Sequence, residues 1–204
     1  ASIKGVIADE ARFEKGEVRR SMERQSVLEA EHCRRADLVL TTSAYSAKRL
    51  RELYGLTAEP AVVPEMIDLA KWRERLDAAK LEKRDGFTVL CVCKLYPRKR
   101  VEVLLEAAAQ LARKIRGFKV RIIGDGPEEN RLQDLHASLE LQGIVEWLGF
   151  VPPDQLAAEY RSCDLFCLPS VQEGFGIVFL EAMAAGVPIV ACRAAAIPEV
   201  VTAG

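Results

Sequence analysis

Short apolar runs alternate with amphipathic stretches from residue 88 to the end of the chain. An uninterrupted apolar run of this length is typical of a parallel strand that is covered on both faces. Between the runs, apolar residues recur at the spacing of a helix face, as between residues 101 and 115. The alternation predicts a Rossmann-like, doubly wound α/β lobe with a parallel sheet. The predicted strands are residues 88–93, 119–123, 144–148, 164–168 and 188–192, with helices near 101–115, between Pro127 and Gly143, at 153–162 and at 177–186.

The first 85 residues predict a smaller part of the fold with fewer strands. Their first third is rich in Glu, Arg and Ala, which favours an exposed helix. A serine that can cap a helix and a glycine that can end one bracket a second helical stretch. The predicted elements are a long helix at 10–35, a strand at 36–42, a helix at 44–54 with Ser43 as its N-cap and Gly55 at its end, a strand at 60–64 and a helix at 69–80.

The composition is that of an ordinary globular protein, 50% hydrophobic and 29% charged, with a net charge of −1. This charge gives no support for nucleic-acid binding, and no apolar run approaches the length of a membrane span. The six cysteines stand mostly in strand-like runs, where a free thiol acts as a small buried hydrophobe. Cys91 and Cys93 share one strand face, but no second pair accompanies them, so we expect no metal and a reducing, cytoplasmic setting. Because the chain does not begin with Met, we expect it to be a fragment.

Polar groups follow the predicted strands at their carboxyl ends, where sheets of this kind bind ligands. Two cations after the first strand could neutralise a diphosphate, although the neighbouring Arg98 and Arg100 fit a solvated basic turn equally well. The residues concerned are Lys94 and Lys99 after the first strand, Gly124 and Gly126 after the second, Gly149 and Phe150 after the third, and Glu173 after the fourth.

Two glutamates frame residues 173–181. Gly174 and Gly176 permit a sharp turn and a close approach to a ligand, and the helix that follows offers unpaired N–H groups to an anion or a sugar hydroxyl. Glu181 could accept two ribose hydroxyls, or it could be satisfied by a neighbouring group of the protein. Glu173 could hold a sugar hydroxyl or simply cap the helix.

The turn at residues 124–127 could let a nucleotide approach the backbone, but an ordinary turn explains it better. It lacks the dinucleotide fingerprint, because Glu129 stands where a third glycine would be required. A nicotinamide-dependent dehydrogenase is therefore disfavoured. His32 and His136 lie in polar helical stretches without a neighbouring nucleophile, so we interpret both as surface residues.

Taken in order, these segments resemble glycosyltransferase family 4, the retaining, nucleotide-sugar-dependent enzymes of the GT-B fold. The resemblance runs from about residue 36 to residue 201. It is most specific at residues 95–99, 122–127, 173–190 and 197–201, and residues 62–68 look like the family's interlobe segment. It implies that residues 1–64 are the end of the first, acceptor-binding lobe, that 65–85 connect the lobes, and that 86–204 are a nucleotide-sugar-binding lobe truncated at its C-terminus.

The resemblance also implies roles for individual residues. Lys99 matches the diphosphate-binding lysine of the family, and Lys94 stands where the family usually has arginine, so it offers a point charge in place of a fork. Glu173 would lie near the donor sugar, Glu181 would bind the ribose, and no metal or other cofactor is implied. The implied catalytic residues are Lys94, Lys99 and Glu173, and the implied substrate-binding residues are Glu181, Gly174, Phe175, Gly176, Gly124, Gly126, Gly149 and Phe150.

Four further residues depart from the family pattern. Cys93 and Arg100 each replace a common glycine, and Ala195 and Ala196 stand where a Gly–Gly pair often occurs. These departures bear on the contacts to the donor and leave the fold assignment intact.

The predicted function is the transfer of a sugar from a nucleoside diphosphate sugar to an acceptor hydroxyl, with retention, as in a hexosyltransferase. The acceptor, whether a sugar, a lipid-linked compound or a small molecule, is open, as are peripheral membrane contact and oligomeric state. We expect the 204-residue piece alone to transfer little. The alternatives are a nucleotide-binding module without catalysis, or another GT-B enzyme such as a nucleotide-sugar epimerase.

Overall fold

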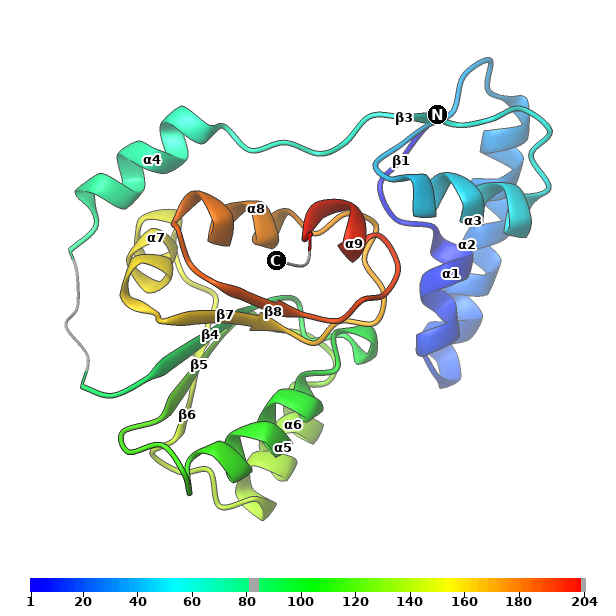
Figure 1. The fold of residues 1–204 in the computed structure, drawn as a ribbon. Helices are drawn as coiled ribbons and strands as arrows, with labels where there is room; N and C mark the ends of the chain where they lie inside the picture. Colours follow the sequence, from blue (N-terminus) through cyan, green and yellow to red (C-terminus); the bar gives the residue numbers. More distant parts are fainter. Residues whose placement is uncertain (81–84, 203–204) are drawn as a thin grey trace. The chain divides into compact units, whose positions relative to one another are not determined.

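The computed structural model describes residues 1–80 and 85–202, and it divides into two compact units (Figure 1). The first unit consists of Ala1–Met66, Val171–Gly176 and Arg193–Gly204, and the second unit consists of Ile67–Ser170 and Ile177–Cys192. The first unit is therefore built from three separate segments of the chain. The functional division into an acceptor lobe, a connector and a donor lobe stays a prediction.

The second unit contains a five-stranded parallel sheet with the strand order β6-β5-β4-β7-β8. The first strand in sequence, β4, lies in the middle, with later strands added first on one side and then on the other. This is the doubly wound arrangement, so the predicted fold class is confirmed. The strands are β4 (Thr88–Val92), β5 (Lys119–Ile123), β6 (Val145–Gly149), β7 (Leu165–Leu168) and β8 (Ile189–Ala191).

Helices cover both faces of this sheet (Figure 1). One face carries α5 (Val101–Leu111) and α6 (Glu129–Ser138), and the other carries α7 (Pro153–Ser162) and α8 (Ile177–Ala184), with α4 (Leu69–Ala78) packed against α7 and α8. A short 3-10 turn, η2 (Pro97–Lys99), precedes α5. Most bounds follow the hydrophobic pattern, because strands buried on both faces and helices with one buried face are specified locally. The helix predicted near 101–115 is shorter and ends at Leu111.

An aromatic cluster joins the helices on the second face to the sheet. The Trp72 and Tyr160 rings meet edge to face at 5.7 Å, Tyr160 stacks on Phe166 at 5.6 Å, and Phe166 meets Phe179 edge to face at 5.9 Å. Tyr160, Phe166 and Phe179 are fully buried. Packed aromatic pairs of this kind stabilise a core beyond the area that they bury.

The first unit has a small parallel sheet of β1 (Ser2–Ile3), β2 (Leu40–Thr41) and β3 (Ala61–Val62). Its core cluster consists of Val6, Ala30, Cys33, Leu50 and Tyr54. Its helices are α1 (Ile7–Glu10), the 3-10 turn η1 (Ala11–Phe13), α2 (Gly16–Arg35), α3 (Ala44–Tyr54) and α9 (Ile197–Val200).

The predicted cap and end of α3 are confirmed. The Ser43 side chain accepts a hydrogen bond from the N–H of Ser46 at 3.1 Å, and Gly55 ends the helix in the left-handed conformation with φ +64°. An L-residue with a Cβ would be strained in that conformation, which explains the glycine.

Three predictions for the first unit are wrong in extent, and one of them is the strand predicted at 60–64, which is reduced to Ala61–Val62. The predicted helix at 10–35 begins only at Gly16, because Lys15 is extended (φ −131°, ψ 166°) and the chain before it folds back as α1 and η1 onto α2. The predicted strand at 36–42 is reduced to Leu40–Thr41. The helix predicted to reach residue 80 ends at Ala78, and residues 81–84 lie outside the described part. Among the described helices, none combines the length and the apolar character that crossing a bilayer requires.

Candidate functional site

The loops that follow β4, β5 and β6 are hydrogen-bonded to one another at the carboxyl edge of the second unit's sheet. The N–H of Leu95 donates to the carbonyl of Asp125 at 2.8 Å, and the N–H of Glu128 donates to the carbonyl of Leu95 at 3.0 Å. The N–H of Gly124 donates to the carbonyl of Gly149 at 2.8 Å. Because the strand order reverses beside β4, this edge is where a doubly wound sheet binds its ligand.

The glycines at 124 and 126 are explained by the packing of these loops. A Cβ at Gly124, whose φ is +124°, would overlap the carbonyl oxygen of Cys93. A Cβ at Gly126 would lie 2.7 Å from the backbone nitrogen of Leu95. Loop packing thus accounts for both glycines without a ligand, in line with the ordinary-turn interpretation.

Gly149 and Phe150 close β6 at the same edge. Gly149 has φ +59° with open space around its Cβ position, so the backbone conformation alone favours glycine there. The Phe150 side chain is 79% exposed. An exposed aromatic ring at the ligand-binding edge of a sheet is available for stacking on a planar group.

Lys94 is an exposed cation with an acidic partner. Its Nζ lies 2.6 Å from Oδ1 of Asp125, and this hydrogen bond raises the pKa of Lys94. The lysine is therefore charged at neutral pH, and its ion pair with Asp125 is exposed to water, which screens it. Asp125 was not singled out from the sequence, although its place just beyond the neighbouring parallel strand is the signal that could have found it.

Lys99 ends the 3-10 turn after β4. Its N–H donates to the carbonyl of Tyr96 at 2.9 Å, and the residue is half-buried. The pKa of the Cys91 thiol is raised by a hydrogen bond with Cys93 and by burial, and the positive charge of Lys99 opposes that rise. The ammonium group therefore acts on the carboxyl end of the central strand.

The other cations of this turn have structural partners. The Arg98 guanidinium lies over the Tyr96 ring at 4.6 Å, and the Arg98 carbonyl accepts a hydrogen bond from Ser170 Oγ at 3.3 Å. Arg100 Nε lies 2.5 Å from Glu102 Oε1. Arg98 and Arg100 thus help to hold the turn.

Glu181 lies on α8 and is held by the aromatic cluster. The Tyr160 hydroxyl donates to its Oε2 at 3.0 Å, and Trp72 Nε1 donates to its backbone carbonyl at 3.2 Å. Burial raises the pKa of Glu181, and the hydrogen bond from Tyr160 opposes that rise. Both aromatic residues were missed as positioning groups, because an aromatic residue on the apolar face of a helix gives only a core signal.

The remaining site residues predicted from the sequence belong to the first unit. Glu173 is only 8% exposed, and Gly176 has φ +98°. A Cβ at Gly174 would overlap the carbonyl oxygen of Lys4, so only glycine fits there. Phe175 is half-buried. The lysines, Glu181 and the strand-end glycines thus belong to the second unit, while residues 173–176 are positioned within the first unit.

The sequence also raised expectations about metal ligands and about the two histidines. Over residues 1–80 and 85–202, no group of three or more His, Cys, Asp or Glu side chains is arranged to hold a metal ion. His32 is exposed, as predicted, but His136 is half-buried and its Nδ1 accepts a hydrogen bond from Trp147 Nε1 at 3.1 Å. His136 is therefore a structural partner of β6, which corrects the surface interpretation.

Known proteins share both the sequence pattern and the fold. The family Glycosyl transferases group 1 matches residues 73–204. A GDP-mannose-dependent alpha-(1-6)-phosphatidylinositol monomannoside mannosyltransferase of Mycolicibacterium smegmatis is 32% identical over 181 residues, covering 83% of this chain and 47% of the relative. The putative colanic acid biosynthesis glycosyltransferase WcaL of Escherichia coli is 34% identical over 177 residues, covering 83% of this chain and 43% of the relative. The chain thus spans a little under half the length of these relatives.

Solved structures with the same fold include Alr3699/HepE of Anabaena in complex with UDP and glucose. The likeness covers 100% of this chain and 55% of that protein, with a TM-score of 0.76 and 24% sequence identity. WaaG, a glycosyltransferase involved in lipopolysaccharide biosynthesis, has a TM-score of 0.69 and 16% sequence identity, and the likeness covers 98% of this chain and 57% of the WaaG chain. From the family match and this GT-B-like architecture, the chain belongs to the group 1 glycosyl transferases.

Proposed function

We propose that this chain contributes the donor-binding part of a glycosyltransferase that moves a sugar from a nucleoside diphosphate sugar to an acceptor hydroxyl. The observation that carries the proposal is the placement of Lys94 and Lys99 directly after the central strand, where the strand order reverses. A ligand bound there meets positive charge at its diphosphate. The family membership supports the same reaction class.

The class of donor is supported by two relatives that differ in the base. The mannosyltransferase of M. smegmatis is named for its dependence on GDP-mannose, and the Anabaena protein has been solved with UDP-glucose. Their shared chemistry is a sugar joined to a nucleoside diphosphate. We therefore propose that donor class for this chain and leave the base and the sugar to experiment.

In the proposed mechanism, the bond between the anomeric carbon and the diphosphate breaks with its electron pair on the diphosphate, the acceptor oxygen bonds to that carbon, and the proton of the acceptor hydroxyl passes to the departing diphosphate. Negative charge builds on the departing diphosphate, and preformed cations lower the barrier by stabilising it. Lys94 and Lys99 share this role in the proposal, and Lys99 matches the diphosphate-binding lysine of family 4 through the resemblance. Retention at the anomeric carbon, with Glu173 and the backbone of residues 174–176 near the sugar, is part of the proposal through the resemblance to family 4.

Glu181 and Phe150 serve the nucleoside in this proposal. An ionised carboxylate has about four acceptor sites, and Tyr160 uses one at Oε2, so hydroxyls of a ribose have acceptors left. The exposed ring of Phe150 suits stacking on the base, with the loops at Gly124, Gly126 and Gly149 beside it. The six cysteines are free thiols, which supports the proposed cytoplasmic setting.

The test is the Lys99→Ala substitution in the full-length protein, after a thermal-shift screen of nucleotide sugars has identified the donor. Losing a cation that stabilises the leaving group should lower kcat by about 10²–10³-fold. Lys114→Ala is the matched control, since Lys114 is an exposed cation that precedes β5 at the opposite end of that strand. An unchanged transfer rate in the Lys99 variant would overturn the assigned role. Analysis of the product from labelled donor separates a transferase from an epimerase, and absent turnover with retained binding indicates a binding module.

A further inference from the structure

Residues 171–176 carry Glu173, and two polar anchors hold this segment within the first unit on either side of that glutamate. Gln172 precedes Glu173 and Gly174 follows it, and both contact residues of the first 66 positions. Neither anchor is visible in the sequence, because each joins residues more than 120 positions apart.

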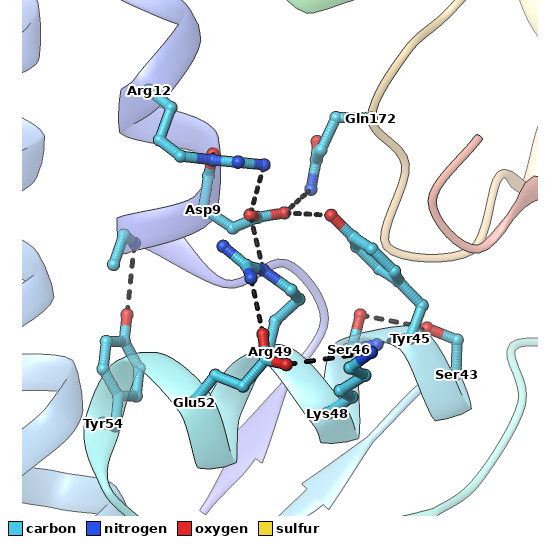
Figure 2. A network of polar contacts seen from close by, with 11 residues as sticks. Asp9, Arg12, Ser43, Tyr45, Ser46, Lys48, Arg49, Glu52, Tyr54 and Gln172 are labelled. Carbon is cyan, nitrogen blue, oxygen red and sulfur yellow. Dashed lines mark hydrogen bonds and ion pairs between the residues drawn. The ribbon is translucent and has the colours of Figure 1, made fainter.

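The first anchor is a buried network around Asp9 (Figure 2). Asp9 has no exposed surface, and its Oδ2 accepts hydrogen bonds from the Tyr45 hydroxyl at 2.7 Å and from Gln172 Nε2 at 3.4 Å. Its Oδ1 lies 2.8 Å from Arg49 Nε and 2.6 Å from an Arg12 nitrogen. A buried carboxylate is tolerated when it is paired and hydrogen-bonded in this way. Asp9 therefore offers Gln172, itself 1% exposed, a fixed acceptor.

The second anchor is the carbonyl of Gly174. It accepts hydrogen bonds from Thr42 Oγ1 at 3.0 Å and from Ser46 Oγ at 3.4 Å. The glycine also packs so closely on the Lys4 carbonyl, which lies 3.3 Å from the same Thr42 hydroxyl, that no side chain fits. The backbone at Gly174 is thus held by hydroxyl donors and by close packing, although glycine itself is the most flexible residue.

The start of α3, with Thr42 just before it and Ser46 in its first turn, is itself fixed by the last segment of the first unit. Glu199 accepts hydrogen bonds from the N–H of Ala44 at 2.7 Å and from the N–H of Tyr45 at 2.8 Å. A carboxylate at a helix N-terminus satisfies donors that the helix leaves unpaired and favours the helix dipole. Residues 1–66, 171–176 and 193–202 therefore meet at this one helix end.

We propose that Gln172, Thr42 and Ser46 are positioning residues that hold Glu173 in the geometry required for sugar transfer, an inference that rests on the proposed role of Glu173 at the donor sugar. Residues of the first unit would then determine the shape of a loop that serves the donor. Fixing a reacting geometry before the substrate binds lowers the barrier to reaction, whereas a loop that must be ordered at that moment raises it.

The test compares Thr42→Val with Thr41→Val in the full-length protein. Both positions are buried, but Thr42 donates to Gly174, whereas the Thr41 hydroxyl has no hydrogen-bond partner in the described part of the chain. Thr42→Val should speed amide hydrogen exchange at residues 173–176 and lower kcat, each by about tenfold, which is the effect of one lost hydrogen bond. The inhibition constants of free UDP and GDP should stay unchanged, because the proposed diphosphate and ribose contacts are made by the second unit. Thr41→Val should change none of these quantities.

Two further variants keep the test decisive. Thr42→Ser retains the hydroxyl and should restore both exchange protection and kcat, and Ser46→Ala removes the second donor if Thr42→Val proves unstable. An active wild-type protein whose Thr42→Val and Ser46→Ala variants keep normal exchange and kcat would overturn this inference alone. If the wild type transfers no sugar from any nucleoside diphosphate sugar, the proposed function fails, and the positioning role falls with it even where exchange shows the loop to be anchored.

Discussion

The two units hold their key glutamates in different ways. Glu181, in the second unit, is fixed by aromatic packing with a hydrogen bond from Tyr160 to its carboxylate. In the first unit, the segment that carries Glu173 is anchored through buried polar groups around Asp9 and at Gly174. An apolar cluster loses stability in proportion to the atoms removed, whereas a buried polar network is strongly weakened when any one partner is lost. The first unit should therefore be the more sensitive of the two to single polar substitutions.

The largest effect is expected from Asp9→Ala. Removing this carboxylate leaves Arg49, whose side chain is 18% exposed, without its closest buried counter-charge, and deprives Tyr45 and Gln172 of their acceptor. Breaking a buried ion pair from one side typically costs about 3–5 kcal/mol. We expect a loss in that range in the free energy of unfolding of the first unit, measured by urea denaturation of the full-length protein.

The partly exposed partner of Asp9 supplies the control. Arg12 is half exposed, so Arg12→Ala should cost about 1 kcal/mol or less, as is usual for a solvated pair. Equal losses for the two variants would show that the network does not act as a buried unit, and the contrast between the two units would then disappear.

The next effect concerns Tyr160→Phe in the second unit. The ring and its packing stay, while the hydroxyl is lost whose single hydrogen is shared between the Val178 carbonyl and Glu181 Oε2, which should cost about 1–2 kcal/mol. The hydrogen bond from Tyr160 opposes the rise in the Glu181 pKa that burial causes, so the pKa should rise further in the variant.

The pH dependence follows from the sign of that shift. A carboxyl group whose pKa is raised on folding binds its proton more tightly in the native state, so its contribution to stability is complete below the unfolded pKa and is lost as the pH rises through the folded pKa. In Tyr160→Phe this loss should extend to higher pH, and in Glu181→Gln it should vanish. The midpoints of urea denaturation between pH 4 and pH 8 measure this pH-dependent loss of stability. Identical pH profiles in all three proteins would show that Glu181 is not strained by burial.

The sequence predicted what depends on neighbouring residues and missed what depends on distant ones. The strand at Lys119–Ile123, the helix at Pro153–Ser162 and the Ser43 cap are specified by local periodicity and capping chemistry, and all were predicted correctly. The contact between Asp9 and Gln172 joins positions 163 residues apart, and neither residue belongs to a recognisable pattern. Likewise, the break before Gly16 is set by the packing of α1 on α2, which competes with a good helical sequence.

The same distinction between local and distant signals applies to the residues of the candidate site. The lysines and Glu181 could be found because they follow strands or stand inside an apolar helix. Asp125 could have been found in the same way, because it follows the neighbouring strand. Tyr160 could not, because tyrosines are common on buried helix faces whether or not a ligand binds nearby. Two of the residues that depart from the family pattern, Arg100 and Ala195, have positive φ, at +54° and +50°. Glycine is favoured in this backbone conformation, which explains the glycines common in the family at these two positions. Sequence alone could not distinguish those positions from Ala196, whose φ is −79°.

The smallest effect is expected from Ala195→Gly, and it compares two neighbouring positions of the first unit. The left-handed conformation costs an L-residue about 1–2 kcal/mol, from which the greater entropy of glycine in the unfolded chain, about 0.5–1 kcal/mol, must be subtracted. Ala195→Gly should therefore stabilise the protein by about 0.5–1 kcal/mol. Ala196→Gly, at a buried residue of ordinary φ, should destabilise it by about 1 kcal/mol, because a packed methyl group is lost and the unfolded chain gains freedom. The urea midpoints of the two variants should thus move in opposite directions. If both substitutions destabilise, the positive φ of Ala195 is held without strain, and the Gly–Gly pair common in the family is required by something other than the backbone at this position.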